Sequence, residues 1–510
     1  MNDSRFAHLF EGNFDLDPIE IASIKHEIEN RTVSINGLRL ELQKLESERE
    51  KYQTLLSPLR CNAVPPEILG QIFKFSLLIA ATSQEKRLKV LCLVCRRWRD
   101  VALGTPSLWA AVNLGVVRKQ GRRLNFERIG TWLARSGVVQ KSLKITGRHS
   151  DFGRCPLPAQ ELSHLLVDRA PFGTLSLECD NGECLERIFS QLPRDTTQNP
   201  MSTSMRSLSL RMVFHPFESF AHVWSILHRF PALDSLSLDL PWFDTIWTVP
   251  EDLRLTNLTG LTLACDWPFL SSVVTILRSC VNLETLVMDY KRLIREPGEA
   301  LPSISDQVLL PRLRKLEMQR LPSESEDTRF LCFLRTPSLQ TLKIRFGPDS
   351  LDPLGDSGLS GFSSDVTSLA KGPNPVSGLQ HLFIQAIPIS SSFGLREVIH
   401  AFPTLVHLTL DGLQSDSSMF KDPFYFDDML LPNLKVLKVL NLQEDGDFEY
   451  EEMFNFLAER REYATEELPD SLEEVEVSII RDPEGQNHPK DAPHASQLAE
   501  EGVAVSISFV

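Results

Sequence analysis

The 510-residue chain has few cysteines, few tyrosines and no long apolar run. Its nine cysteines are odd in number and widely spread, from Cys61 to Cys332. This argues against a disulfide scaffold and fits a reducing compartment, cytoplasmic or nuclear. The longest apolar run, Val90–Cys95, is much shorter than the roughly 18 residues of a membrane span, so we expect no membrane partner. The first residues are polar and acidic and do not resemble a secretory signal.

Motifs that carry catalysis are also missing. The sequence has no G-x-x-x-x-G-K-[ST] loop and no G-x-G-x-x-G motif after a strand. Residues 355–358 miss a nucleophile elbow by one position, and residues 26–30 lack the second histidine of a metalloprotease helix. Cys92 and Cys95 have no second cysteine pair at zinc spacing. We therefore expect no catalytic residue, no metal and no cofactor.

Charge is distributed unevenly. The chain has 53 Lys and Arg against 68 Asp and Glu, a net charge of −15. Residues 86–148 hold 15 basic and two acidic side chains, whereas residues 444–502 hold 19 acidic and four basic ones. The few aromatic residues of the basic window form no stacking motif, so nucleic acid is not an expected partner. The window is either a solvated surface or a docking site for an acidic protein.

Residues 17–57 have the pattern of a long amphipathic helix. Asp17-Pro18 is a helix-start signal, because an Asp can cap the first turn and a proline fits its first position. Apolar residues then recur at steps of three and four, with gaps at Arg31 and Arg49: Ile21, Ile24, Ile28, Ile35, Leu38, Leu42, Leu45 and Tyr52. This heptad seam predicts a coiled coil or a helix hairpin that ends at Pro58, and a coiled-coil homodimer is one consequence. The alternative is a single helix packed on its own domain.

The next segment contains a series of short motifs in a fixed order. The proline pair of Val64-Pro65-Pro66-Glu67 opens a helix whose apolar face includes Ile68, Leu69, Ile72 and Phe73. A polar turn then leads to a second predicted helix, with Val90, Leu91, Val94 and Trp98 on one stripe. A short final turn follows at Pro106-Ser107-Leu108-Trp109.

This order of motifs resembles the F-box. The family pattern reads Leu-Pro-x-Glu-Ile-Leu, Ile-Phe, Val-Cys-Arg-x-Trp-Arg and Pro-x-Leu-Trp, and the chain departs from it at Val64, where leucine is usual. A helix running into Ser57-Pro58 just upstream is similar to the layout of a large group of fungal F-box proteins. The resemblance implies an α-helical F-box at residues 58–112 that docks a Skp-like adaptor and, through it, a cullin.

A module of about 50 residues buries too little surface to be robust alone, so its apolar faces need another surface. The adaptor is acidic in the family, which suits the basic window. We predict the adaptor contacts to be Val64, Pro65, Ile68, Leu69, Ile72, Phe73, Leu91, Val94 and Trp98. The alternative for each is a place in the core of the module itself.

The remaining chain, residues 139–510, repeats one short pattern. Copies of Leu-x-x-Leu-x-Leu, or close variants, start at Leu233, Leu258, Leu283, Leu313, Leu339, Leu379, Leu405, Leu434 and Leu472, 25 to 40 residues apart. Looser copies precede them at Met205, Phe172 and Leu143. The alternation predicts short strands with one buried face, separated by amphipathic helices. We expect an α/β solenoid of irregular leucine-rich repeats, with a terminal strand at residues 504–510.

Two wide spacings predict loop insertions, at residues 347–378 and 482–496, because both are rich in polar residues, glycine or proline. The strand residues between the leucines would form the concave face, where a target protein is expected to bind; they include Ser235, Ser237, Lys315, Glu317, Thr341, Lys343, His381, Phe383, His407 and Lys438. These side chains are mixed in type, so the sequence does not identify the target.

Three hypotheses for function follow. The first is the substrate-recognition subunit of a Skp–cullin–F-box ubiquitin ligase, in which the F-box docks the adaptor and the repeats hold an unknown protein substrate. The second is a scaffold that uses the F-box and the coiled coil for assembly without ubiquitin transfer. The third, a hydrolase using a Cys or Ser of the repeat region, has no motif in its favour.

Overall fold

The chain forms two compact units, Met1–Thr105 and Pro106–Val510. None of the helices in the described parts of the chain has both the length and the apolar character needed to cross a bilayer. The computed structural model describes residues 17–78, 84–117, 125–148, 159–168, 172–179, 182–192, 203–212, 224, 226–240, 249–250, 253–267, 270–293, 307–321, 330–347, 356–371, 376, 378–386, 392–413, 417–422, 424–425, 428–443, 448–463, 470–480 and 493–509.

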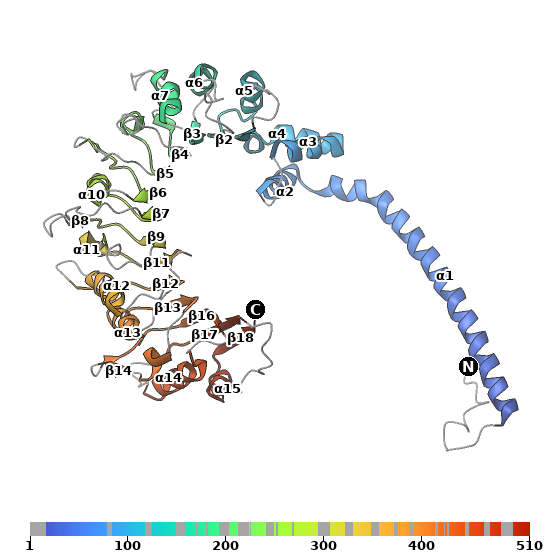
Figure 1. Cartoon of the computed structure of the whole chain (residues 1–510). Coiled ribbons are helices and arrows are strands. Elements are labelled where there is room, and N and C mark those ends of the chain that lie inside the picture. The colour runs from blue at the N-terminus through green and yellow to red at the C-terminus, as the bar shows by residue number, and fades with distance from the viewer. Residues whose placement is uncertain are drawn as a thin grey trace. The chain divides into compact units, whose positions relative to one another are not determined.

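The first unit begins with α1, one continuous helix from Pro18 to Ala63 (Figure 1). At its start the backbone N–H of Asp17 donates to the Glu20 carboxylate at 3.2 Å, which is one of the two bonds of a capping box. Most of its heptad-spaced apolar side chains are exposed: Ile21, Ile28, Ile35, Leu38, Leu42, Leu45 and Tyr52. The predicted seam is therefore on the surface, with Ile24 only partly covered.

The prediction that Pro58 ends this helix is wrong, because α1 continues for five more residues. A proline removes one backbone donor from a helix, but the residues after it keep their own hydrogen bonds. The chain leaves the helix at Val64, whose φ of −76° and ψ of 125° are extended. The ring of the following Pro65 favours that conformation.

Three short helices follow in this unit: α2 (Pro66–Leu78), α3 (Gln84–Val94) and α4 (Arg96–Gly104). The sequence predicted one helix where α3 and α4 lie. The break is at Cys95, which is extended (φ −159°, ψ 171°) and whose Sγ accepts a hydrogen bond from the Trp98 backbone N–H at 3.4 Å. Cys95 thus caps α4, and Trp98 does not continue the α3 stripe.

The second unit contains a parallel sheet of 14 strands whose spatial order is their order in the chain (Figure 1). Each strand pairs with the strands before and after it, as expected for stacked repeats. The strands are β1 (Ala111–Val117), β2 (Lys141–Arg148), β3 (Phe172–Cys179), β4 (Ser207–Met212), β5 (Ser235–Asp239), β6 (Gly260–Trp267), β7 (Thr285–Leu293), β9 (Lys315–Leu321), β11 (Thr341–Phe346), β12 (His381–Gln385), β13 (His407–Asp411), β16 (Val436–Gln443), β17 (Glu474–Ile480) and β18 (Ala504–Phe509).

Helices cover one face of this sheet, which makes the unit a leucine-rich-repeat-like solenoid (Figure 1). The helices are α5 (Phe126–Ala134), α6 (Ala159–Asp168), α7 (Gly182–Ser190), α10 (Leu270–Arg278), α11 (Phe330–Phe333), α12 (Asp356–Ser368), α13 (Ser392–His400), α14 (Tyr450–Glu462) and α15 (Pro493–Glu500). Two 3₁₀ turns, η2 (Pro106–Leu108) and η6 (Ser417–Phe420), and two small sheets complete the unit: β8 (Val308–Leu309) with β10 (Leu334–Arg335), and β14 (Phe424–Tyr425) with β15 (Asp428–Met429).

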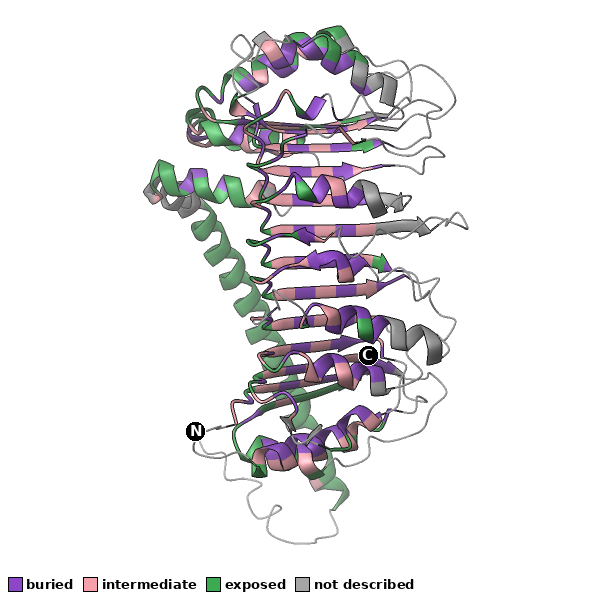
Figure 2. Cartoon of the chain, turned by 90° about the vertical axis from the view of Figure 1, so that its left-hand side faces the viewer, coloured by how far each residue is buried: buried purple, intermediate pink, exposed green. Residues whose placement is uncertain are grey.

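The repeat leucines are aligned from strand to strand. Leu236 is paired with Leu261, and Leu261 with Leu286, and all three are buried. Buried and partly exposed residues alternate along the strands (Figure 2). All nine predicted Leu-x-x-Leu copies form strands of the sheet, as do the three looser copies and the terminal strand. The sequence analysis did not predict β1, in which Val112 and Leu114 lie opposite Leu143 and Ile145 of β2.

A ladder of polar side chains joins successive repeats. Asn257, immediately before a repeat leucine, donates to the Pro231 carbonyl of the preceding repeat at 2.8 Å. Asn282 and Asn433 make the equivalent bonds to Thr256 and Pro403 at 2.7 and 3.0 Å. Each bond satisfies a carbonyl in the turn before a strand, which fixes one repeat against the next.

Part of the predicted loop insertion at residues 347–378 is helical, which corrects that expectation. Helix α12 spans Asp356–Ser368, and its Phe362 and Val366 are buried in the main core, with Phe362 packed edge-to-face on Phe346 at 5.5 Å between ring centroids. Two apolar residues four apart, among many Gly and Ser, are enough to anchor a helix to a sheet. In the other predicted insertion, residues 482–492 lie outside the described residues, and residue 493 already begins α15.

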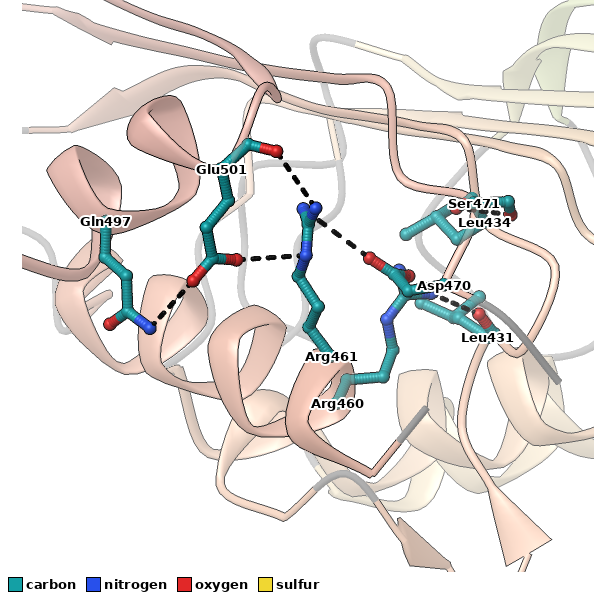
Figure 3. Close-up of polar contacts among 8 residues, drawn as sticks. All are labelled: Leu431, Leu434, Arg460, Arg461, Asp470, Ser471, Gln497 and Glu501. Carbon is teal, nitrogen blue, oxygen red and sulfur yellow. Dashed lines mark hydrogen bonds and ion pairs between the residues drawn. The ribbon is translucent and has the colours of Figure 1, made fainter. Parts of the chain in front are cut away.

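The C-terminal repeats contain a buried polar cluster (Figure 3). Arg460 of α14 forms an ion pair with Asp470, and both side chains are almost fully buried. Arg460 also donates to the Leu431 carbonyl at 2.5 Å. The neighbouring Arg461 forms an ion pair with Glu501 at 2.9 Å, which connects α14 to the end of α15. Burial is the main cause that lowers the pKa of Arg460, and the charge of Asp470 opposes that shift.

Candidate partner-binding surface

Helix α2 has two apolar faces with different environments. Leu69 and Phe73, four residues apart, are buried in the unit. Ile68, Ile72 and Phe75, at spacings of four and three, are exposed. Residues at these spacings lie along one side of a helix, so the exposed side chains form a continuous stripe. The first face holds the unit together and the second is available to another molecule.

Helix α3 repeats this arrangement. Leu88 is completely buried, whereas Val90, Leu93 and Val94 are exposed. Basic side chains lie on the same helix and the next one: Lys86, Lys89, Arg96 and Arg99 are exposed. Of these, Lys89 forms an ion pair within α3, with Glu85 at 2.6 Å. The exposed apolar residues are therefore surrounded by positive charge.

The buried contacts of α2 and α4 fix the position of the exposed stripe. The rings of Phe73 and Trp98 pack at 4.9 Å between centroids. A guanidinium nitrogen of Arg97 donates to the Val64 carbonyl, at the entry to α2. A Cβ added to Gly70 would lie 2.9 Å from the Thr105 hydroxyl oxygen, so this glycine permits close approach of α2 to the end of α4.

The nine predicted adaptor contacts have three kinds of environment. Pro65, Ile68, Ile72 and Val94 are exposed. Val64, Leu91 and Trp98 are partly buried. Leu69 and Phe73 are buried within the unit. The structure adds Phe75, Val90 and Leu93 as exposed apolar residues outside the predicted set, and a search for apolar residues seven positions beyond Ile68 would have found Phe75.

Two cysteines of the repeat region have thiols with raised pKa values. Burial raises the pKa of Cys280 to about 12, and burial is also the largest cause that raises the pKa of Cys332 to about 11. Both thiols are therefore protonated at neutral pH and are poor nucleophiles. Within the described residues, no group of three His, Cys, Asp or Glu side chains is placed to bind a metal ion.

Comparison with known families identifies the helical module. Residues 61–114 match the family model F-box-like. The match contains α2, α3, α4, η2 and the beginning of β1. The F-box-like domain therefore includes the exposed stripes of α2 and α3. No curated protein matches the chain.

Two solved structures resemble the chain at low similarity. A protein from Bacteroides fragilis is 13% identical, with a TM-score of 0.30, over 62% of this chain and 68% of that protein. TLR13, in its complex with ssRNA13, is 12% identical, with a TM-score of 0.23, over 72% of this chain and 55% of that protein. At these TM-scores neither likeness extends to function.

Proposed function

We propose that this protein is the substrate-recognition subunit of a Skp–cullin–F-box ubiquitin ligase. The F-box-like domain docks a Skp-like adaptor, which connects the chain to a cullin, and the repeats, irregular in length, bind a target protein. The chain supplies no chemical group, because holding the target near a ubiquitin carrier is enough to accelerate transfer. The proposed location of this ligase is the cytoplasm or the nucleus. The proposed domain layout is that of fungal F-box proteins.

The observation that carries this proposal is the exposed apolar stripe of the F-box-like domain. Ile68, Ile72 and Phe75 on α2 are large side chains in contact with water. Burying each of them against a partner would contribute about 1.5–3 kcal/mol. Exposed apolar clusters rimmed by charge are typical of protein interaction sites. The exposed basic residues of α3 and α4 suit an acidic adaptor.

The decisive experiment is adaptor co-purification with the double variant Ile68→Asp, Ile72→Asp. Both side chains are exposed in the free chain, so the substitutions leave the fold intact while placing two charges in the interface. We expect adaptor binding to be lost. The matched control is Val138→Asp, which alters a side chain that is 97% exposed in the second unit and should leave binding unchanged. Undiminished binding by the double variant would contradict the proposed docking surface.

The presence of a cullin in the purified complex distinguishes the ligase hypothesis from the scaffold hypothesis. A complex that contains the adaptor, the cullin and this chain, and that ubiquitinates a co-purified protein, supports the ligase. A complex with adaptor but without cullin supports a scaffold. The second result would leave the docking surface valid and overturn the ubiquitin-ligase function.

Helix α1 supports a further part of the proposal, a coiled-coil homodimer. Its seam is exposed, and the positions that flank the seam are asymmetric in charge. One flank carries Glu20, Glu27, Ser34, Glu41 and Glu48, and the other carries Lys25, Thr32, Arg39, Glu46 and Gln53. An antiparallel pair would place the glutamate flanks against each other, whereas a parallel pair places the glutamate flank against the mixed flank. We therefore infer a parallel homodimer.

A further inference from the structure

One face of the solenoid sheet is not covered by helices. The outward side chains on this face change in size and charge along the chain. On β4 and β5 the outward residues Ser207, Ser209, Ser235 and Ser237 are small and neutral, and the remaining outward pair, Arg211 and Asp239, forms an ion pair. From β9 to β13 they are large, and several are basic or aromatic. We call this group the β9–β13 patch; it consists of Lys315, Glu317, Lys343, Arg345, His381, Phe383 and His407. All of them are partly exposed except Glu317, which is buried.

Two cations of the patch lie over one aromatic ring. Phe383 of β12 is directly opposite Lys343 of β11 in the sheet. The Lys343 Nζ lies 5.7 Å from the centre of the Phe383 ring, and the guanidinium carbon of Arg345 lies 5.4 Å from it. Beside them, the rings of His381 and His407 pack edge-to-face at 4.4 Å. The ring holds both cations near the surface without neutralising them.

The patch has more positive than negative charge. Glu317 forms an ion pair with Lys315 at 3.0 Å and accepts a hydrogen bond from Gln319 at 2.6 Å. The other outward carboxylate of these strands, Asp411 at the end of β13, accepts a hydrogen bond from Asn441 at 2.6 Å. Neither Lys343 nor Arg345 forms an ion pair with any residue that the structure describes. The positive charge of Arg345 stabilises the Glu317 carboxylate from a longer distance. The buried Nε of Arg345 also has no hydrogen-bond partner among the described residues.

Other cations of the same sheet are already paired. Lys438 contacts Glu474 and Glu476 at 2.8 and 2.7 Å. Arg211 contacts Asp239 at 3.0 Å. Lys343 lies opposite Glu317 in the sheet, but that carboxylate is already paired with Lys315, so among the described residues neither Lys343 nor Arg345 has an ion-pair partner of its own. These two cations are therefore available to an external carboxylate.

We propose that the β9–β13 patch binds an acidic, extended segment of a partner protein, with carboxylates on Lys343 and Arg345. The proposal rests on the proposed function in one respect, since this segment would belong to the target. Lys343 and Arg345 are two positions apart on β11, which corresponds to about 6.6 Å along a strand. Acidic residues at alternate positions of an extended segment have the same spacing, so an alternating acidic sequence matches the two cations.

Carboxylates fit this surface better than a nucleic acid does. A phosphodiester backbone requires a continuous series of cations. The patch contains the carboxylate of Glu317, directly opposite Lys343, and the whole chain has a net charge of −15, which repels a polyanion at longer range. A short acidic segment needs only the local excess of positive charge.

The experiment measures binding of the full-length chain to a fluorescent 12-residue peptide of alternating Glu and Ser, by anisotropy. We expect saturable binding, weakened at least about tenfold by Lys343→Glu with Arg345→Glu, because each close charge pair becomes a repulsion. The neutral pair Lys343→Met with Arg345→Gln should weaken it less. The matched control is Lys144→Glu, at the equivalent exposed position of β2, which should leave binding unchanged. Circular dichroism of each variant confirms the fold.

Four outcomes would overturn the proposal: no binding by the unmodified chain, equal weakening by Lys144→Glu, equal affinity for a peptide with its acids in one block, or tighter binding of a single-stranded oligonucleotide through the same residues. Adaptor co-purification by the Lys343 and Arg345 variants is measured in parallel. Loss of peptide binding with normal adaptor binding supports this site. Peptide binding in a chain that never binds an adaptor would retain the site and refute the proposed function.

Discussion

Ile68 and Leu69 are neighbours in α2 with opposite environments: Ile68 is 53% exposed and Leu69 is 5% exposed. Two adjacent residues of similar size therefore have separate tasks, one at the surface of the F-box-like domain and one in its core. This difference allows binding and folding to be tested independently at neighbouring positions.

Substitution at these two positions should separate binding from stability. Leu69→Ala should destabilise the F-box-like domain by about 2–5 kcal/mol, because it leaves a cavity. Ile68→Ala should change stability by less than about 0.5 kcal/mol but weaken adaptor binding. Hydrogen exchange of the α2–α4 amides measures the first effect and adaptor titration the second. Equal effects of both variants on hydrogen exchange would contradict the assignment of faces.

The coiled-coil homodimer predicts a position-specific effect on mass. Leu38 lies on the seam and is 67% exposed, whereas Leu40 lies on the opposite side of α1 and is 69% exposed. Leu38→Asp should convert the dimer into a monomer of 57.7 kDa, because it places two charges against each other in the seam. Leu40→Asp should remain dimeric. Sedimentation equilibrium measures both masses, and an unmodified chain that sediments as a monomer refutes the homodimer.

The buried ion pair of the C-terminal repeats predicts a large loss of stability in a conservative variant. Asp470→Asn should destabilise this region by about 3–5 kcal/mol, because the charge of Arg460 stays buried without its partner. Glu501→Gln, which breaks the half-exposed pair with Arg461, should cost about 0–1 kcal/mol. Urea unfolding with hydrogen exchange in α14 measures both values. A smaller effect at Asp470 than at Glu501 would contradict the role assigned to the buried pair.

The histidine pair predicts a dependence of stability on pH. Burial, then the charges of His407 and Lys343, lower the pKa of His381 below its ordinary value of 6.5. The unfolded chain therefore binds a proton at His381 before the folded chain does, so stability falls as the pH drops below 6.5. The loss stops growing once His381 is protonated in the folded chain.

A pair of variants tests this assignment. His381→Gln should remove the contribution of His381 to the pH dependence of the free energy of unfolding, measured with urea between pH 7.5 and pH 5.5. His407→Gln should raise the pKa of His381 only in part, because burial is the larger cause and remains. An NMR titration of the labelled histidine rings measures that pKa. A midpoint for His381 above 6.5 would contradict the prediction.

The repeat strands were predictable because their signal is local. The alternation of Leu236 and Leu238 with polar residues indicates a strand with one buried face wherever it occurs. Strand β1 was missed because its alternation of Val112 and Leu114 with Asn113 and Gly115 is short and lies outside the Leu-x-x-Leu pattern; it pairs with β2 in the sheet. Helix α12 was missed because glycines and serines dominate its composition; among its described side chains, Phe362 and Val366 belong to the main core.

The candidate site was predictable in kind but not in detail. Helical spacing identified Ile68 and Leu69 as apolar residues of α2, but it could not assign one to the surface and one to the core, since both faces of α2 are apolar. The break at Cys95 was also hidden, because no proline or glycine marks it. The polar ladder of Asn257, Asn282 and Asn433 depends on contacts between repeats about 26 residues apart in sequence, which a local reading does not detect.

The repeat leucines stay aligned from strand to strand although four strand pairs contain a register shift. This alignment separates the length of a repeat from the position of its outward residues. Between β11 and β12 the chain makes its longest excursion among the repeats, yet Lys343 still lies directly opposite Phe383. Connecting segments can therefore lengthen or shorten without displacing the outward side chains of the sheet, and a single outward side chain can be exchanged while the backbone of the strands is unchanged.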